Sequence, residues 1–186
     1  ILAECTGANH GDGKTPLSQG PQQKKVDEVT WRGVCEGLDR LARRAAARGM
    51  KTAYHPHMGT LVQTREDVDA LMAGTRDLGL LLDTGHLAFS GDDPMITLQK
   101  HSGRITHVHT KDLRFAVARQ ARAEGWSFER AVRAGVFTVP GDGDIDFAAL
   151  LGELNRSGYA GWVVVEAEQD PKVANPLEYA KKGRAT

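Results

Sequence analysis

This sequence has few cysteines, no excess of charge of one sign and no long apolar run. Its 186 residues include two cysteines, too few for a disulfide framework, which favours a reducing, cytoplasmic environment. The 24 basic and 24 acidic residues balance, which argues against a broad nucleic-acid-binding face. No apolar run approaches the ~20 residues that cross a bilayer, so we expect no membrane contact. Residues 1–5 lack the basic flank and apolar stretch of a signal peptide.

The remaining composition is that of one folded domain. Apolar residues make up 40% of the chain and charged residues 26%, which excludes disordered and fibrous classes. No low-complexity segment or second domain is evident along the chain. We therefore expect residues 1–186 to form a single domain.

Short apolar runs alternate with amphipathic stretches. Leu78–Leu82 and Trp162–Val165 are wholly apolar, as expected of strands buried on both faces of a parallel sheet. Strands that alternate with helices at this spacing indicate parallel βα units in an α/β fold. Five strands are predicted, near residues 1–5, 52–55, 78–82, 105–109 and 162–165.

Helix signals fall between these strands. They predict helices over 26–45, after the capping box of Thr64 and Asp67, from Pro94, over 116–134, after Asp146 and over 176–183.

The number of predicted βα units fits two folds. A five-stranded doubly wound sheet suits the length, whereas a closed (β/α)8 barrel typically needs ~250 residues. Counting alone does not choose between them.

Histidines and carboxylates gather where the predicted strands end. Five of the seven histidines lie there, and the gaps from His55 to Asp83 and from Asp83 to His109 each match one βα unit. The carboxyl ends of parallel strands share one rim, where barrel active sites are built. Imidazoles mixed with carboxylates suit Mn²⁺, Co²⁺ or Zn²⁺ better than Ca²⁺. The strand ends are His55-Pro56-His57, Asp83-Thr84-Gly85-His86, His107-Val108-His109 and Glu166-Ala167-Glu168.

Each of these residues also has a structural interpretation. A single histidine near a strand end is usually a hydrogen-bonded structural group, and Asp83 could simply cap a helix. The concentration of histidines at the strand ends nevertheless favours a metal site. His10 and His101 lie outside these ends and are predicted to be ordinary surface residues.

Two features near the start of the chain have weaker functional interpretations. The stretch from Gly7 to Thr15 looks like a phosphate-binding loop, but its spacing is one residue too long, and Pro16 prevents a long helix from following. Cys5 could be a nucleophile or a metal ligand, although we favour an inert thiol at a strand end.

The strand-end motifs resemble those of the xylose-isomerase-like sugar isomerase and epimerase superfamily. The resemblance implies a (β/α)8 TIM barrel with one divalent metal held by its late strands. It implies that Asp83, His109 and Glu166 bind this metal and that His86 contacts substrate. His55 stands where isomerases of the superfamily usually carry a metal-binding glutamate. Because epimerisation can use two carboxylates, this replacement favours elimination of water.

Six stretches are more specifically similar to the myo-inosose-2 dehydratases. The similarity implies a metal-dependent lyase of inositol catabolism, using Mn²⁺ or Co²⁺, that removes water from a cyclic polyol ketone. It begins at about the fourth strand of eight, so we expect the C-terminal part of a barrel that lacks the first three βα units. The stretches are Glu4–Gly7, Thr15–Gln19, His57–Thr60, Leu82–His86, Val136–Gly143 and Val165–Pro171.

These resemblances assign a role to each strand-end residue. The predicted metal ligands are His55, Asp83, His109 and Glu166. The predicted catalytic residues are Glu166, His86, His57 and Lys111, and the predicted substrate-binding residues are His57, His86, Lys111 and Glu168. Lys111 would hold developing negative charge or, alternatively, pair with Asp112. Gly141 and Gly143 would let their loop approach the site, or serve as plain turn residues.

Two other functions stay open on the sequence alone. One is a sugar isomerase or epimerase on the same scaffold, which product analysis would distinguish. The other is a non-catalytic remnant, a partial barrel whose exposed sheet edges self-associate into a homo-oligomer. An endonuclease is less well supported, because no basic DNA-binding face is evident.

Overall fold

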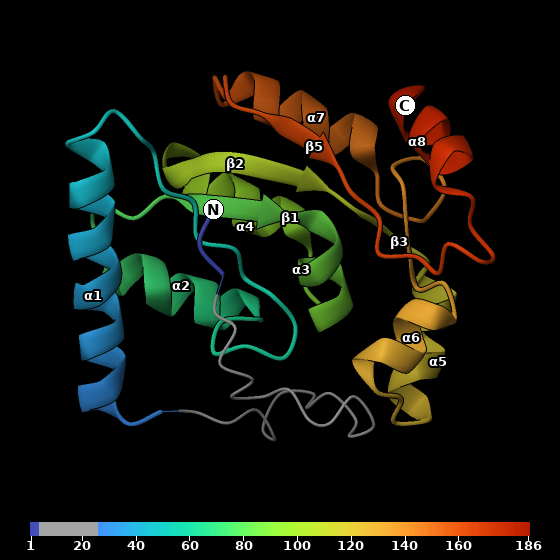
Figure 1. Ribbon diagram of the computed structural model, residues 1–186, viewed down its shortest axis with the longest axis horizontal. Coiled ribbons are helices and arrows are strands. Elements are labelled where there is room, and N and C mark those ends of the chain that lie inside the picture. Colours follow the sequence, from blue (N-terminus) through green and yellow to red (C-terminus); the bar gives the residue numbers. More distant parts are fainter. Residues whose placement is uncertain (4–25) are drawn as a thin grey trace.

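A parallel sheet forms the centre of the protein (Figure 1). The computed structural model describes residues 1–3 and 26–186. The strands β1 (Leu80–Asp83), β2 (Ile105–Thr110) and β5 (Val163–Val165) lie side by side in that order. Leu2 and Tyr54 extend the sheet beyond β1 through single parallel bridges. All five predicted strands therefore occur in one parallel sheet, the first two as one-residue bridges.

Helices cover one face of this sheet. The apolar core joins β1 and β2 to residues of α1, α2, α4 and α7, including Leu71, Leu98 and Leu150. Alternation along the strands places Leu80, Leu82 and Val108 on this face and leaves Asp83 and His109 on the other. The helices are α1 (Glu28–Ala46), α2 (Arg65–Gly74), α3 (Thr84–Ser90), α4 (Pro94–His101), α5 (Phe115–Ala123), α6 (Phe128–Arg133), α7 (Phe147–Arg156) and α8 (Pro176–Arg184), with a 3₁₀ turn at Ser102–Arg104.

Most helix starts lie where the sequence predicts them. Thr64 and Asp67 form the predicted capping box of α2, and Pro94 occupies the first turn of α4. Asp146 caps α7 by accepting a hydrogen bond from the backbone N–H of Ala149 at 2.9 Å. These side chains satisfy backbone donors that the first helical turn leaves unpaired.

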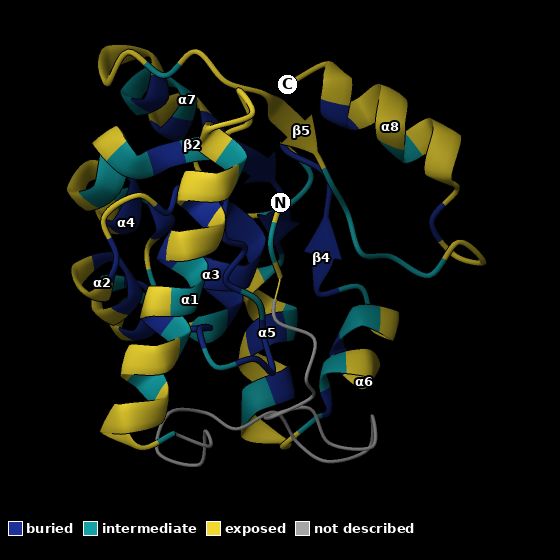
Figure 2. Cartoon of the chain, turned by 60° about the vertical axis from the view of Figure 1, so that its left-hand side comes forward, coloured by how far each residue is buried: buried dark blue, intermediate teal, exposed yellow. Residues whose placement is uncertain are grey.

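Two predictions about the elements are wrong. The stretch 116–134 is two helices, α5 and α6, because Gly125 adopts a positive φ of 61° and ends the first of them. Trp162–Val165 is exposed and not buried on both faces, whereas β1 is fully buried. The cause is position, since β5 pairs only with β2 among the described strands and lies at the sheet edge (Figure 2). In the described residues the sheet does not close into a barrel.

Some of the sequence predictions concern residues outside the described ranges. They are the inert thiol of Cys5, the surface position of His10, the phosphate-loop-like stretch 7–15 and the two similar stretches 4–7 and 15–19. His101 is described, and the prediction that it is an ordinary surface residue is wrong. Its ring is largely buried and lies 2.7 Å from a carboxylate oxygen of Asp69. No helix among the described residues is long and apolar enough to span a membrane.

We expect Asp39→Ala to destabilise the fold by about 1–3 kcal/mol, because three backbone donors would lose their acceptor. The buried Asp39 carboxylate on α1 accepts hydrogen bonds from the backbone N–H groups of Arg76, Asp77 and Leu78, just before β1. Urea unfolding in dilute solution measures the loss. Asp77→Ala is the control, since within residues 26–186 the Asp77 side chain makes only an exposed pair with Arg43.

The contribution of Asp39 should also depend on pH. Burial alone would raise the pKa of Asp39, but the backbone hydrogen bonds and Arg43 outweigh burial and lower the pKa. A carboxylate with a lowered pKa stabilises the folded state above its unfolded pKa of ~3.9 and loses that contribution as the pH falls through the folded value. Equal losses for Asp39→Ala and Asp77→Ala would contradict this role.

Candidate metal centre

The four predicted metal ligands lie at the carboxyl ends of the parallel strands. Asp83 ends β1 and is the register partner of His109 on β2. Glu166 directly follows β5, whose last residue pairs with Thr110. His55 follows the bridge at Tyr54, on the other side of β1. The parallel order of the strands thus brings together side chains from four segments of the chain.

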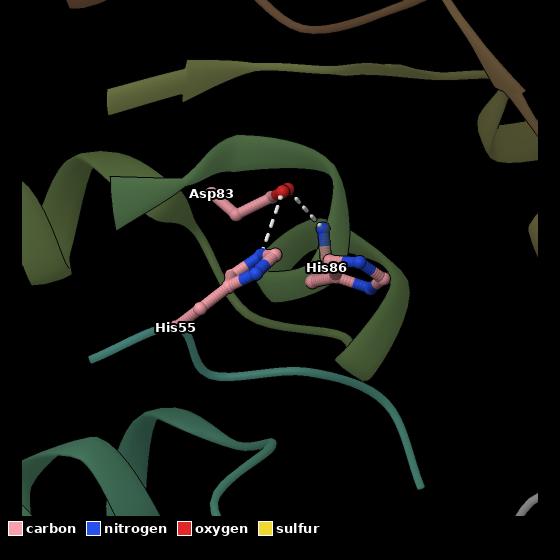
Figure 3. A group of neighbouring side chains, drawn as sticks. All are labelled: His55, Asp83 and His86. Atoms are coloured by element: carbon pink, nitrogen blue, oxygen red, sulfur yellow. Dashed lines mark hydrogen bonds and ion pairs between the residues drawn. The ribbon is translucent and has the colours of Figure 1, made fainter. Parts of the chain in front are cut away.

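Asp83 lies at the centre of this group. Its Oδ2 atom is 3.1 Å from His55 Nε2 and 3.5 Å from His109 Nδ1. Its Oδ1 atom accepts a hydrogen bond from the backbone N–H of His86 and caps α3, as Figure 3 shows. His109 Nδ1 is in turn 3.0 Å from Glu166 Oε2. Both interpretations of Asp83 therefore fit, since one oxygen caps a helix and the other faces the histidines.

The donor atoms at these strand ends are suited to a cation. The ligand atoms of Asp83, His109 and Glu166 all lie within 4.8 Å of one another. His109 Nδ1 and Glu166 Oε2 are buried, yet neither makes an aligned hydrogen bond within the described part of the chain. Buried polar atoms without partners are costly, and a cation placed among them would remove that cost. Imidazole nitrogens with carboxylate oxygens are a set that transition metals accept.

The electrostatics of the group keep its carboxylates ionised beside positively charged neighbours. Burial would raise the pKa of Asp83, but Lys111 and the neighbouring histidines hold it well below its ordinary value. Burial would also raise the pKa of Glu166, but the close contact with His109 and the charge of Lys111 lower the pKa instead. Conversely, the pKa of His109 rises to about 9, because Asp83 and Glu166 outweigh the effect of burial.

Lys111 is the resident cation of the site. Its side chain is fully buried, and its Nζ lies 3.0 Å from Glu166 Oε2, 3.3 Å from Glu168 Oε2 and 3.5 Å from Asp83 Oδ2. Nζ is also 3.0 Å from His86 Nε2. Burial opposes its charge, but the three carboxylates raise the pKa of Lys111. It therefore stays charged at neutral pH.

The alternative in which Lys111 pairs with Asp112 is wrong. The buried Asp112 carboxylate instead accepts hydrogen bonds from the backbone N–H groups of Leu113, Gly141, Gly143 and Ile145. A Cβ at Gly143 would lie 2.4 Å from Asp112 Oδ1, so only glycine leaves room for the carboxylate. Asp112 thus fastens the loop 140–145 beside the strand end that carries Lys111.

The Asp83-Thr84-Gly85-His86 motif is built around Lys111. The Thr84 hydroxyl donates to the Lys111 carbonyl at 2.7 Å, and the Lys111 N–H donates to the Thr84 hydroxyl at 3.0 Å. A Cβ at Gly85 would lie 2.6 Å from Lys111 Cγ, so glycine makes room for the lysine stem. This packing does not follow from the motif alone, and the sequence prediction missed it.

The predicted substrate-binding residues form a second group beside the first. His57 Nε2 and His86 Nε2 lie 3.7 and 3.8 Å from the Glu168 carboxylate, and the two rings are 3.8 Å apart. These three residues also have metal-ligand spacing. The ammonium group of Lys111 lies against both His86 and Glu168 in this second group, as it does against Glu166 in the first.

The two histidines of this second group differ in their protonation. Burial lowers the pKa of His86 well below its ordinary value, so the ring is neutral. Because the Lys111 ammonium can only donate to Nε2, the proton of His86 lies on Nδ1, which is buried without a hydrogen-bond partner. Burial alone would lower the pKa of His57, but the contacts with Glu168 and the Met58 carbonyl outweigh burial, so the pKa of His57 is raised.

The sequence of this chain is similar to those of known proteins. The family model described as "Xylose isomerase-like TIM barrel" matches residues 7–185. An inosose dehydratase from Geobacillus thermodenitrificans is 50% identical over 99% of this chain and 62% of its own length. The rhizopine catabolism protein MocC of Rhizobium meliloti is 47% identical over 98% of this chain and 56% of its own length. The chain thus spans about three-fifths of these relatives.

A solved structure gives the same fold. The crystal structure of the IolI protein with a bound zinc atom aligns with a TM-score of 0.64 at 24% sequence identity. The alignment covers 88% of this chain and 58% of that one. At this level of identity the similarity concerns the fold, and it agrees with an incomplete barrel of the same architecture.

Proposed function

The chain belongs to the xylose isomerase-like TIM barrel family, and on that premise we propose that it is the metal-binding part of an inosose dehydratase. The proposed reaction removes water from a cyclic polyol ketone in inositol catabolism, in the cytoplasm. The observation that carries the proposal is the convergence of His55, Asp83, His109 and Glu166, in which His109 Nδ1 and Glu166 Oε2 are buried without an aligned hydrogen bond in the described part of the chain. The identity of 50% to an inosose dehydratase supports the choice of substrate.

We propose that these four side chains hold one divalent ion, Mn²⁺ or Co²⁺. Two imidazoles with two carboxylates make a mixed nitrogen and oxygen set that suits both metals. When bound, such an ion supplies Lewis acidity to a ketone oxygen. All four ligands come from different strand ends, so the sheet itself fixes their spacing.

We expect metal binding to release about one proton per ion at neutral pH. His109 has a pKa of about 9 without metal, so it is protonated at pH 7 and must lose that proton before its nitrogen can bind an ion. Affinity should therefore rise about tenfold per pH unit up to about pH 9 and then level off. Calorimetry of Mn²⁺ binding in buffers of different ionisation enthalpy measures the release. Binding without proton release at pH 7 would contradict the assignment of His109.

Glu166 is the proposed base of the reaction. Its carboxylate is partly exposed, and its lowered pKa keeps it ionised at neutral pH. In the proposed step it removes the proton next to the ketone, the electron pair of that C–H bond forms the new carbon–carbon double bond, and the bond between the neighbouring carbon and its hydroxyl breaks. Lys111, 3.0 Å from Glu166, holds a positive charge beside the carbon skeleton as negative charge develops.

His57 and His86 have separate proposed roles. His57 is the proposed acid, because its raised pKa lets it carry a proton to the departing hydroxyl, and Glu168 stabilises its charged form. The hydroxyl then leaves as water, which balances the proton taken by Glu166. His86 is neutral, and its unpaired Nδ1–H suits a substrate hydroxyl. It is therefore a substrate clamp in this proposal.

Product analysis tests this function against the isomerase alternative. The assay uses a chimera, in which the part of the Geobacillus thermodenitrificans relative that this chain does not span is joined to the chain. With Mn²⁺ or Co²⁺, an inosose should lose the mass of one water molecule. A product of unchanged mass with altered stereochemistry would instead identify an isomerase or epimerase and overturn the dehydratase proposal.

A further inference from the structure

One segment of the chain carries an aromatic side chain next to His57 and His86. The short strands β3 (Asp112–Leu113) and β4 (Phe137–Thr138) are antiparallel partners, so the chain leaves the site at β3 and returns to it at β4. Helices α5 and α6 occupy the segment between them and extend away from the parallel sheet (Figure 1). The first residue of α6 is Phe128, which Ser127 precedes as the helix cap.

Phe128 belongs to a cluster of three phenylalanine rings. Its ring centroid is 6.0 Å from that of Phe89 and 5.9 Å from that of Phe137. Phe89 and Phe137 are buried, and they support Phe128 from the core side. Phe128 itself is only half-buried. The cluster therefore has one ring that stays partly open.

The open ring faces the second group of the site. The Phe128 centroid lies 5.7 Å from that of His57 and 6.0 Å from that of His86, and it stacks on His86 at an interplanar angle of 27°. Beside it lies His86 Nδ1, a buried donor without a partner. The half-buried Phe128 ring and the unsatisfied His86 donor are thus neighbours, and small-molecule sites combine such apolar and polar groups.

We propose that Phe128 contacts the C–H face of the cyclic substrate and selects rings over open-chain ketoses. This inference rests on the proposed dehydratase function. A cyclic polyol has a hydroxyl-bearing rim and a face of C–H groups. The histidines and Lys111 offer polar partners to the rim, whereas the negative face of the Phe128 ring attracts C–H groups. An open chain presents no such face continuously, so it loses this contact.

The contact should appear in substrate binding more than in chemistry. An aromatic contact contributes about 0.5–1.5 kcal/mol, which corresponds to roughly a 3–10-fold change in affinity. In the chimera, Phe128→Ala should raise KM for an inosose by about that factor and change kcat less. Phe128→Tyr keeps the ring and should restore KM. The same variants of the chimera are titrated with myo-inositol by calorimetry, and Phe128→Ala should weaken binding by a similar factor.

Phe115→Ala is the matched control. Phe115 begins α5, on the same segment between β3 and β4, and is 39% exposed, but among the described residues it makes none of the ring contacts of Phe128. It should leave KM and myo-inositol binding unchanged. If Phe128→Ala and Phe115→Ala behave alike, or if Phe128→Tyr fails to restore a KM that Phe128→Ala has raised, the assignment of Phe128 is overturned.

Different experimental results would overturn the role of Phe128 and the proposed dehydratase function. Unchanged KM and binding in Phe128→Ala, with water still released by the parent chimera, would overturn the role of Phe128 alone. If the parent chimera releases no water from an inosose, the dehydratase proposal is overturned. In that case weaker myo-inositol binding by Phe128→Ala still supports the ring contact, and unchanged or absent binding overturns it.

Discussion

Glu166→Gln should reduce dehydration of an inosose by the chimera by about 10²–10⁴-fold, the usual contribution of a positioned acid or base. The amide cannot take a proton, and it gives up the negative charge that faces His109 Nδ1 and Lys111 Nζ at 3.0 Å. The fold should survive, because Glu166 follows β5 at the partly exposed end of the sheet. Steady-state kinetics measures the loss, and circular dichroism checks the fold.

Glu153→Gln controls for this substitution. Glu153 lies on α7, away from the metal centre, and among the residues that the structure describes its side chain pairs only with an exposed Arg156. It should retain the activity of the parent. Measuring bound Mn²⁺ in both variants separates the two roles of Glu166, since lost activity with retained metal identifies the base. Full activity in Glu166→Gln would remove Glu166 from the mechanism.

The 186-residue chain by itself should self-associate strongly. At the sheet edge, Trp162 is 78% exposed, and the three valines of β5 are exposed beside it. An uncovered edge strand pairs readily with another chain, and burying apolar surface contributes about 25 cal/mol per Å². Because an aromatic side chain buries roughly 150–250 Å², Trp162 alone would contribute several kcal/mol. Analytical ultracentrifugation over a range of concentrations should show oligomers or aggregates.

A pair of lysine substitutions tests whether the sheet edge causes the association. Trp162→Lys places a charge on the edge strand and should weaken association at least tenfold. Val173→Lys is the matched control, because Val173 is equally exposed at 78% but lies outside the sheet. It should leave association nearly unchanged. A monodisperse monomer of the unsubstituted chain, with a sharp thermal transition, would contradict this expectation.

The arrangement of the strands and their ends was predictable from the sequence. Buried parallel strands read as apolar runs, and their carboxyl ends lie on one side of the sheet, so the sequence predicts that His55, Asp83, His109 and Glu166 meet there. The structure brings them together there. Their roles as metal ligands rest on this geometry and stay a proposal.

The features that sequence reasoning missed depend on packing between distant segments. Lys111 contacts His86 and Glu168 because Thr84 and Gly85 position its backbone and stem, and no local pattern encodes that fit. Likewise, Phe128 reaches the histidines only because β3 and β4 close the segment between them. The exposure of β5 depends on what lies beside the strand, which the apolar stretch Trp162–Val165 does not specify.

The most direct test of the metal centre is a crystal of the manganese-loaded chimera measured at the Mn absorption edge. The account predicts one anomalous peak, within about 2.0–2.2 Å of His55 Nε2, Asp83 Oδ2, His109 Nδ1 and Glu166 Oε2, since ligand bonds in such mixed sites have that length. Lys111 should remain beside Glu168 and His86, outside the ion's ligands. A peak among His57, His86 and Glu168, or no peak at either group, would contradict the proposed centre.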